Sequence, residues 1–242
     1  MSRPDNIADQ PVYTPHIGES RQYWRDIILG VNDGLVSIFL LVVGVVGGGF
    51  STKQVLLTAV AGSIAGAISM AAGEYLATKS QDEVLEAELT LEREHIRDHR
   101  DMELDQLREM FADMGLHPED VDLVVSAFDR SDEALLGAMK ALEFGIVDSE
   151  RRSPYTAMFA SGGLFLLGSL PSVLPFMFLQ STNIALVWAS LLALGGLFVV
   201  GVVKARVTGG SWARSGSENM VIAGFGGVAA WFIGDVVGRG LA

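Results

Sequence analysis

Carboxylate and imidazole side chains recur at helical spacing near the middle of the chain. At separations of three or four residues the sequence carries Glu88, Glu92, His95, His99 and Glu103. In a continuous helix, residues at these separations lie along one face. Carboxylate oxygens and imidazole nitrogens together suit iron, manganese or zinc. The pattern therefore predicts metal ligands among these five residues.

The alternative for this segment is an ordinary solvated acidic face. Arg93, Arg97 and Arg100 are interspersed among the acidic residues, as they are on many exposed helices. Two histidines in register with the glutamates favour metal binding over that alternative.

A second donor pair follows later in the sequence. Met139 and Glu143 are four residues apart, so a helix would place a thioether and a carboxylate on the same face. Met139 could equally be an ordinary core residue. We include both residues among the candidate metal ligands.

Three further candidates lie within strongly apolar segments. Asp33 is an ionisable residue inside the first of these segments, where a charge is costly and therefore suggests function. Met70 lies in the second segment at a similar distance from the same side, so the two side chains are expected at similar depth. Glu74 is one turn beyond Met70, where it would pass ions or protons onward or reach the membrane interface.

Five apolar segments are long enough to span a membrane as helices. A span needs about 20 apolar residues, because only a helix satisfies its own backbone in lipid. The predicted spans are residues 26–49, 54–78, 155–179, 183–204 and 219–237.

The acidic excess of the chain lies between the second and third spans. The net charge is −12, and residues 79–153 hold 21 Asp and Glu against 9 Lys and Arg. Basic residues in the short flanks precede span 1 and join spans 4 and 5, which predicts that these flanks are cytoplasmic. With five spans, the acidic insert is then cytoplasmic as well.

The insert itself is predicted to be helical. No proline or glycine occurs between Thr78 and Gly115, so span 2 should continue as a helix to about Arg97. Gly115 is typical of the C′ residue that ends a helix, Pro118 is expected to begin the next helix, and Ser131 is expected to cap a third. We therefore expect three helices in the insert.

The predicted fold is an all-α polytopic membrane protein with five transmembrane helices and a three-helix cytoplasmic insert after span 2. Its expected divisions are an N-terminal cytoplasmic arm (1–25), spans 1 and 2 (26–78), an acidic metal-binding domain (79–153) and spans 3 to 5 (154–242).

Two segments resemble the signatures of the vacuolar iron transporter family. They are residues 30–35 (GVNDGL) and 67–75 (AISMAAGEY), and the five-span layout with its insert is similar too. The resemblance implies a homodimeric antiporter of ferrous iron and protons, with Asp33 and Met70 as intramembrane ligands on the dimer axis.

The same resemblance assigns metal ligation in the insert to Glu92, Glu103, Met139 and Glu143. Of two other positions that carry glutamate in the family, one is His95 here and the other falls near Gln106. Gly62 also departs from plant-type members, which carry an acidic residue there. Glu74 is instead a feature closer to fungal- and bacterial-type members, so proton coupling is expected to use a different carboxylate from that of the plant-type members.

We predict that the protein exports Fe²⁺, and possibly Mn²⁺, from the cytoplasm by proton antiport. Fe²⁺ or Mn²⁺ is expected as bound substrate, with no prosthetic group, no enzymatic activity and no nucleic-acid partner. The expected location is the inner membrane of a prokaryote or the vacuolar membrane of a eukaryote.

Two alternatives remain open. One is a membrane-anchored di-iron ferroxidase, because Glu92 and His95 match the Glu-x-x-His spacing of carboxylate bundles. The other is a membrane protein that senses metal without transporting it. The absence of cysteine excludes thiolate ligands, and no nucleotide-binding loop or nucleophile elbow is present.

Overall fold

The described chain is helical throughout, and five of its helices span the membrane. The structure is a computed structural model that describes residues 21–145 and 153–241. Within those residues there is no β-strand. The spans are α1 (Arg21–Gly47), α2 (Thr52–Asp98), α6 (Pro154–Phe178), α7 (Thr182–Thr208) and α8 (Trp212–Leu241). The all-α fold with five transmembrane helices is therefore confirmed.

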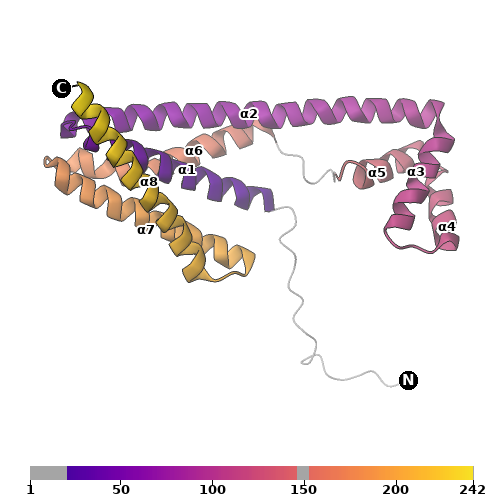
Figure 1. Ribbon diagram of the computed structural model, residues 1–242. Coiled ribbons are helices and arrows are strands. Elements are labelled where there is room, and N and C mark those ends of the chain that lie inside the picture. The colour runs from indigo at the N-terminus through magenta and orange to yellow at the C-terminus, as the bar shows by residue number, and fades with distance from the viewer. Residues whose placement is uncertain (1–20, 146–152, 242) are drawn as a thin grey trace, which may run out of the picture.

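Helix α2 is much longer than a membrane is thick. Its 47 residues extend about 70 Å at 1.5 Å per residue. Figure 1 shows its first half packed beside the other spans and its second half projecting away from them to carry α3, α4 and α5. The predicted continuation of span 2 to about Arg97 is confirmed. The beginning of α2 is held to the α6–α7 turn, because the Thr52 hydroxyl lies 2.8 Å from the Gln180 carbonyl.

Helix α1 is central to the membrane bundle and packs against the other four spans. Small residues permit this close approach. A side chain at Gly34 would collide with the backbone of Phe165 on α6, and one at Gly234 on α8 would collide with the Gly44 carbonyl on α1. The buried core of the bundle includes Ile38, Val42 and Phe165. The backbone of α1, which carries Asp33, is therefore tightly fixed.

Beyond α2 the insert contains three short helices, and the predicted boundaries at Gly115, Pro118 and Ser131 are confirmed, whereas the start of the first short helix at Arg100 was not predicted. The three helices are α3 (Arg100–Asp113), α4 (Pro118–Phe128) and α5 (Asp132–Leu142). Gly115 follows α3 with a φ of 93°, a conformation that favours glycine. The Ser131 hydroxyl caps α5 by accepting a hydrogen bond from the Ala134 amide at 3.2 Å.

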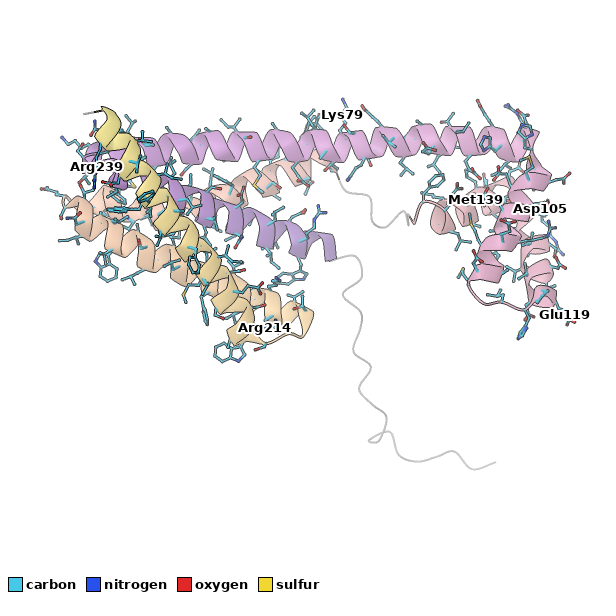
Figure 2. The ribbon with its side chains drawn as sticks, in the orientation of Figure 1. Lys79, Asp105, Glu119, Met139, Arg214 and Arg239 are labelled. Carbon is cyan, nitrogen blue, oxygen red and sulfur yellow. The ribbon has the colours of Figure 1, made fainter. Side chains whose placement is uncertain are left out.

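A separate hydrophobic core holds the insert together. It contains Ile96 from α2, Leu104 and Leu107 from α3, Val121 and Val125 from α4, and Leu135, Ala138 and Met139 from α5. The four helices therefore form one packed unit at the far end of α2, and Figure 2 shows Met139 within it.

Three expectations need correction. Helix α1 begins at Arg21, before the predicted start of span 1 at Asp26. Helix α8 begins at Trp212, seven residues before the predicted start of span 5 at Asn219. The continuous helical face through Glu103 was wrong, because α2 ends at Asp98 and α3 begins at Arg100, with His99 at φ −137° and ψ 36° between them. Residues 1–20 of the predicted arm and residues 146–152 of the predicted insert lie outside the described residues.

Candidate metal-binding sites

The helix break at His99 creates a cluster of three metal-type ligands in the insert. Glu92 and His95 lie on the last turns of α2, and Glu103 lies on the first turn of α3. One ligand atom from each lies within 4.8 Å of the other two, and His95 Nδ1 is 3.4 Å from Glu103 Oε1. Two carboxylates and one imidazole form a donor set suited to a divalent transition metal.

Both carboxylates of the cluster are buried, whereas His95 remains partly exposed. Glu92 Oε1 and Glu103 Oε2 are shielded from solvent and accept no hydrogen bond within the described parts of the chain. Buried polar atoms without partners are costly. A divalent cation between them would satisfy both oxygens and offset the repulsion between the two carboxylates.

The pKa of Glu92 reflects this crowding. The pKa is raised to about 7, mainly by burial of the carboxyl and additionally by the nearby negative charges of Glu103 and Glu143. Glu92 lies beyond the membrane-spanning part of α2, so the shift comes from the insert itself. Binding a divalent cation would require this carboxyl to release its proton near neutral pH.

Helix α5 brings the other two predicted insert ligands to the same region. Met139 is fully buried in the core beside Ile96 and Leu107, which lie one turn after Glu92 and Glu103 respectively. Glu143 caps the end of α5 and is near enough to raise the pKa of Glu92, although its own side chain is exposed. The insert thus gathers five candidate ligands from three helices.

The two remaining residues of the original helical pattern lie outside this three-ligand cluster. Glu88 is exposed one turn earlier on α2. His99 occupies the break, where its ring centroid lies 6.4 Å from that of His95. The structure therefore divides a pattern that appeared uniform in the sequence.

A second candidate site lies among the membrane spans. Asp33 and Ser37 of α1, Ser69 and Met70 of α2, and Phe165 of α6 line an open groove with a volume of about 440 Å³. Small residues keep the groove open. At Gly62, an added Cβ would approach Leu41 Cδ2 to 2.5 Å, so a larger residue there would fill part of the groove. Asp33 and Met70 thus supply a carboxylate and a thioether to one groove of the membrane bundle.

Ser37 holds the carboxylate of Asp33 in this groove. Its hydroxyl donates a 3.0 Å hydrogen bond to Asp33 Oδ1. The sequence analysis missed Ser37, although its position one helical turn after Asp33 was a usable signal. Among the described residues Ser37 is the one hydrogen-bond partner of Asp33, which leaves the other carboxylate oxygen available to a cation.

Glu74 and Asp235 occupy different surroundings from Asp33. Glu74 is half-buried one turn beyond Met70 on the side of the insert and is not part of the groove lining. Asp235 accepts a 3.0 Å hydrogen bond from Arg239 in the last turns of α8, where Gly238 lies against the backbone of Gly48, just after the end of α1. That ion pair accounts for Asp235 without a transport role.

Comparison with known proteins identifies sequences similar over most of the chain. A sequence model of the VIT family matches residues 24–235. This region includes nearly all of the five spans, together with the groove and the insert cluster. The match therefore extends to both candidate sites.

Curated relatives are identical to this chain at between about a quarter and a third of the aligned residues. It is 32% identical to vacuolar iron transporter 1 of Arabidopsis thaliana, covering 88% of this chain and 85% of that protein. Vacuolar iron transporter 2 of Oryza sativa subsp. japonica is 33% identical, with 88% and 87% covered. Protein CCC1 of Saccharomyces cerevisiae is 26% identical, with 88% and 68% covered.

Proposed function

This chain belongs to the VIT family of transporters, and from that premise we propose that it exports Fe²⁺ from the cytoplasm in exchange for protons. Membership of the family makes it a membrane transporter of metal and not an enzyme. The observation that carries the more specific proposal is the groove in which Asp33 and Met70 lie together inside the bundle. A carboxylate and a thioether at that depth provide a binding site for a partly dehydrated metal ion.

The insert is proposed to capture the ion before it enters the membrane. Glu92, His95 and Glu103 form a compact donor set, and Met139 and Glu143 lie close to it on α5. Glu74 lies between the insert and Met70 along α2, so it is the proposed intermediate carboxylate on the path. Metal would then pass from the insert to Glu74 and on to the groove.

Proton exchange follows from the chemistry of these ligands. A carboxylate binds either a proton or a metal ion, so protonation from the acidic side would release the metal and reset the site. The raised pKa of Glu92 supports this for the capture step. Within the membrane, Asp33 and Glu74 are the proposed proton carriers.

Mn²⁺ is proposed as a second substrate. The donor set contains carboxylate oxygens, one imidazole and thioether sulfur, all of which both Fe²⁺ and Mn²⁺ accept. No thiolate is present in the sequence, so the site lacks the ligand that most favours softer ions such as Cu⁺.

The functional unit is proposed to be a homodimer with the insert in the cytoplasm. The groove is open in the single chain, and we propose that a second copy closes it around Asp33 and Met70. Val84 and Leu91 are exposed at heptad spacing on the projecting part of α2, and a partner helix would cover them. The cytoplasmic orientation rests on the basic flanks of spans 1, 4 and 5.

Reconstitution into proteoliposomes tests this proposal. Purified protein would be given an external Fe²⁺ or Mn²⁺ gradient, a metal-quenched dye inside and an imposed pH difference. The proposal predicts metal-dependent quenching that accelerates when the interior is acidic and is accompanied by proton movement. Metal flux that ignores the pH difference would contradict antiport, and binding without flux would instead favour a metal sensor.

A further inference from the structure

Arg100 is the first residue of α3 and joins the helix break to the opposite side of the insert. Its Nε donates to Asp129 Oδ1 at 2.7 Å, its Nη1 donates to Asp132 Oδ1 at 2.6 Å, and its Nη2 donates to the Asp129 carbonyl at 2.6 Å. Asp129 caps the end of α4 and Asp132 is the first residue of α5. One guanidinium therefore binds both helices where they meet.

Arg100 makes longer-range contacts than the other paired arginines of the insert. Among the described residues, Arg97 pairs with its sequence neighbour Asp98, and Arg108 pairs with Asp105 on its own helix and with Asp122 on α4. Arg100 instead reaches 29 and 32 residues along the chain and is only 29% exposed. A planar guanidinium can hold several acceptors at fixed angles, which a lysine ammonium cannot do.

The two structures that Arg100 connects determine where the candidate metal ligands lie. The break at His99, directly before Arg100, turns Glu103 back toward Glu92 and His95. The α4–α5 turn sets the start of α5, and α5 carries Met139 and Glu143. Moving this turn relative to the break would displace both α5 donors from the cluster.

We propose that Arg100 is a positioning residue for the candidate metal ligands of the insert, because it fixes the α4–α5 turn to the α2–α3 break. This inference rests on the proposed capture of metal by the insert. Arg100 does not touch the ion itself. Its role is to keep the α5 donors in place against Glu92, His95 and Glu103.

The test compares Arg100→Gln and Arg100→Lys with the matched control Arg97→Gln in the purified full-length protein. Co²⁺ serves as the probe, since its visible absorption reports both affinity and coordination geometry. We expect Arg100→Gln to weaken Co²⁺ binding by about tenfold and to alter the absorption band, because residues that orient the metal ligands typically have effects of this size. Arg100→Lys should not restore the band, and Arg97→Gln should behave as wild type.

Three other outcomes are distinguishable. A lower melting temperature for Arg100→Gln with unchanged Co²⁺ affinity and absorption would show a purely structural role and overturn the inference alone. Wild-type protein that binds no Co²⁺ would overturn the proposed capture site as well. If Arg100→Gln does not fold, Asp132→Asn removes one acceptor and is expected to weaken Co²⁺ binding in the same direction; unchanged binding there would also overturn the inference.

Discussion

His95 and Glu103 are eight residues apart in sequence, yet His95 Nδ1 lies 3.4 Å from Glu103 Oε1. In an unbroken helix, eight residues would separate them by about 12 Å along the axis. The break at His99 removes that separation and turns α3 back against α2. This single change of direction converts an acidic helix face into a compact donor set.

The first prediction concerns the ligands of this cluster. Glu103→Gln should weaken divalent-metal binding by the insert by about tenfold or more, since losing a ligand should cost at least as much affinity as losing a residue that orients a ligand. Glu88→Gln is the matched control, because Glu88 is exposed and lies outside the cluster. Calorimetric titration with Mn²⁺ measures both. Equal effects of the two substitutions would indicate a diffuse acidic surface and not a site.

The second prediction concerns pH. The pKa of Glu92 is raised from 4.5 to about 7, so the folded apo protein binds this proton more tightly than the unfolded chain does. The resulting stabilisation is complete below about pH 4.5 and is lost as pH rises through about 7. With chelator present, wild type should therefore lose more thermal stability between pH 5.5 and 8 than Glu92→Gln does. Parallel pH profiles for the two proteins would contradict the assignment.

The same carboxyl makes metal binding depend on pH in the opposite sense. Because Glu92 must be deprotonated to bind a cation, the affinity of the insert for Mn²⁺ should rise as pH increases from 6 to 8. Calorimetry in buffers of different ionisation enthalpy would count the protons released. No proton release on binding near pH 6.5 would show that Glu92 does not ligate the metal.

The third prediction tests the cap of α5. Ser131→Ala removes the hydroxyl that accepts from the Ala134 amide and should cost about 1 kcal/mol of insert stability. Ser126→Ala is the control, since Ser126 lies within α4, where its hydroxyl donates back to the Leu123 carbonyl. Thermal unfolding of the two variants provides the comparison. A larger loss for Ser126→Ala would contradict the cap.

The fourth prediction tests the close packing of α1 and α8. Gly234→Ala should cost about 1–3 kcal/mol, because its Cβ would meet the Gly44 carbonyl, which cannot move without its helix. Gly224→Ala on the same helix should be tolerated, since a Cβ there meets nothing within 4 Å. The melting temperatures of the two variants would be measured in the same detergent. Similar melting temperatures would show that α8 is not tightly packed at Gly234.

The sequence predicted those features of the fold that depend on local chemistry. Hydropathy identified the five spans, and Gly115, Pro118 and Ser131 gave the helix boundaries of the insert. The start of α8 was missed because residues 209–217 are rich in glycine and serine, like a loop. In the structure Gly201 of α7 lies against the backbone of Ser215, so tertiary packing extends the helix there.

The break at His99 was not predictable in the same way. No proline or glycine marks it, and the residues on either side favour a helix. It accompanies tertiary packing, because α3 buries Leu104 and Leu107 in the core shared with α4 and α5. The residues of the insert cluster were thus recognisable by type, while the geometry that unites them depends on contacts far apart in sequence.

The central claim is that metal crosses the membrane through the groove that contains Asp33 and Met70. Its most direct test is the rate of Fe²⁺ or Mn²⁺ flux into proteoliposomes for Asp33→Asn beside Asp235→Asn, with metal binding by the insert measured on the same preparations. We predict that Asp33→Asn abolishes flux while the insert still binds metal, and that Asp235→Asn transports at a rate near wild type. Flux retained by Asp33→Asn would contradict the account.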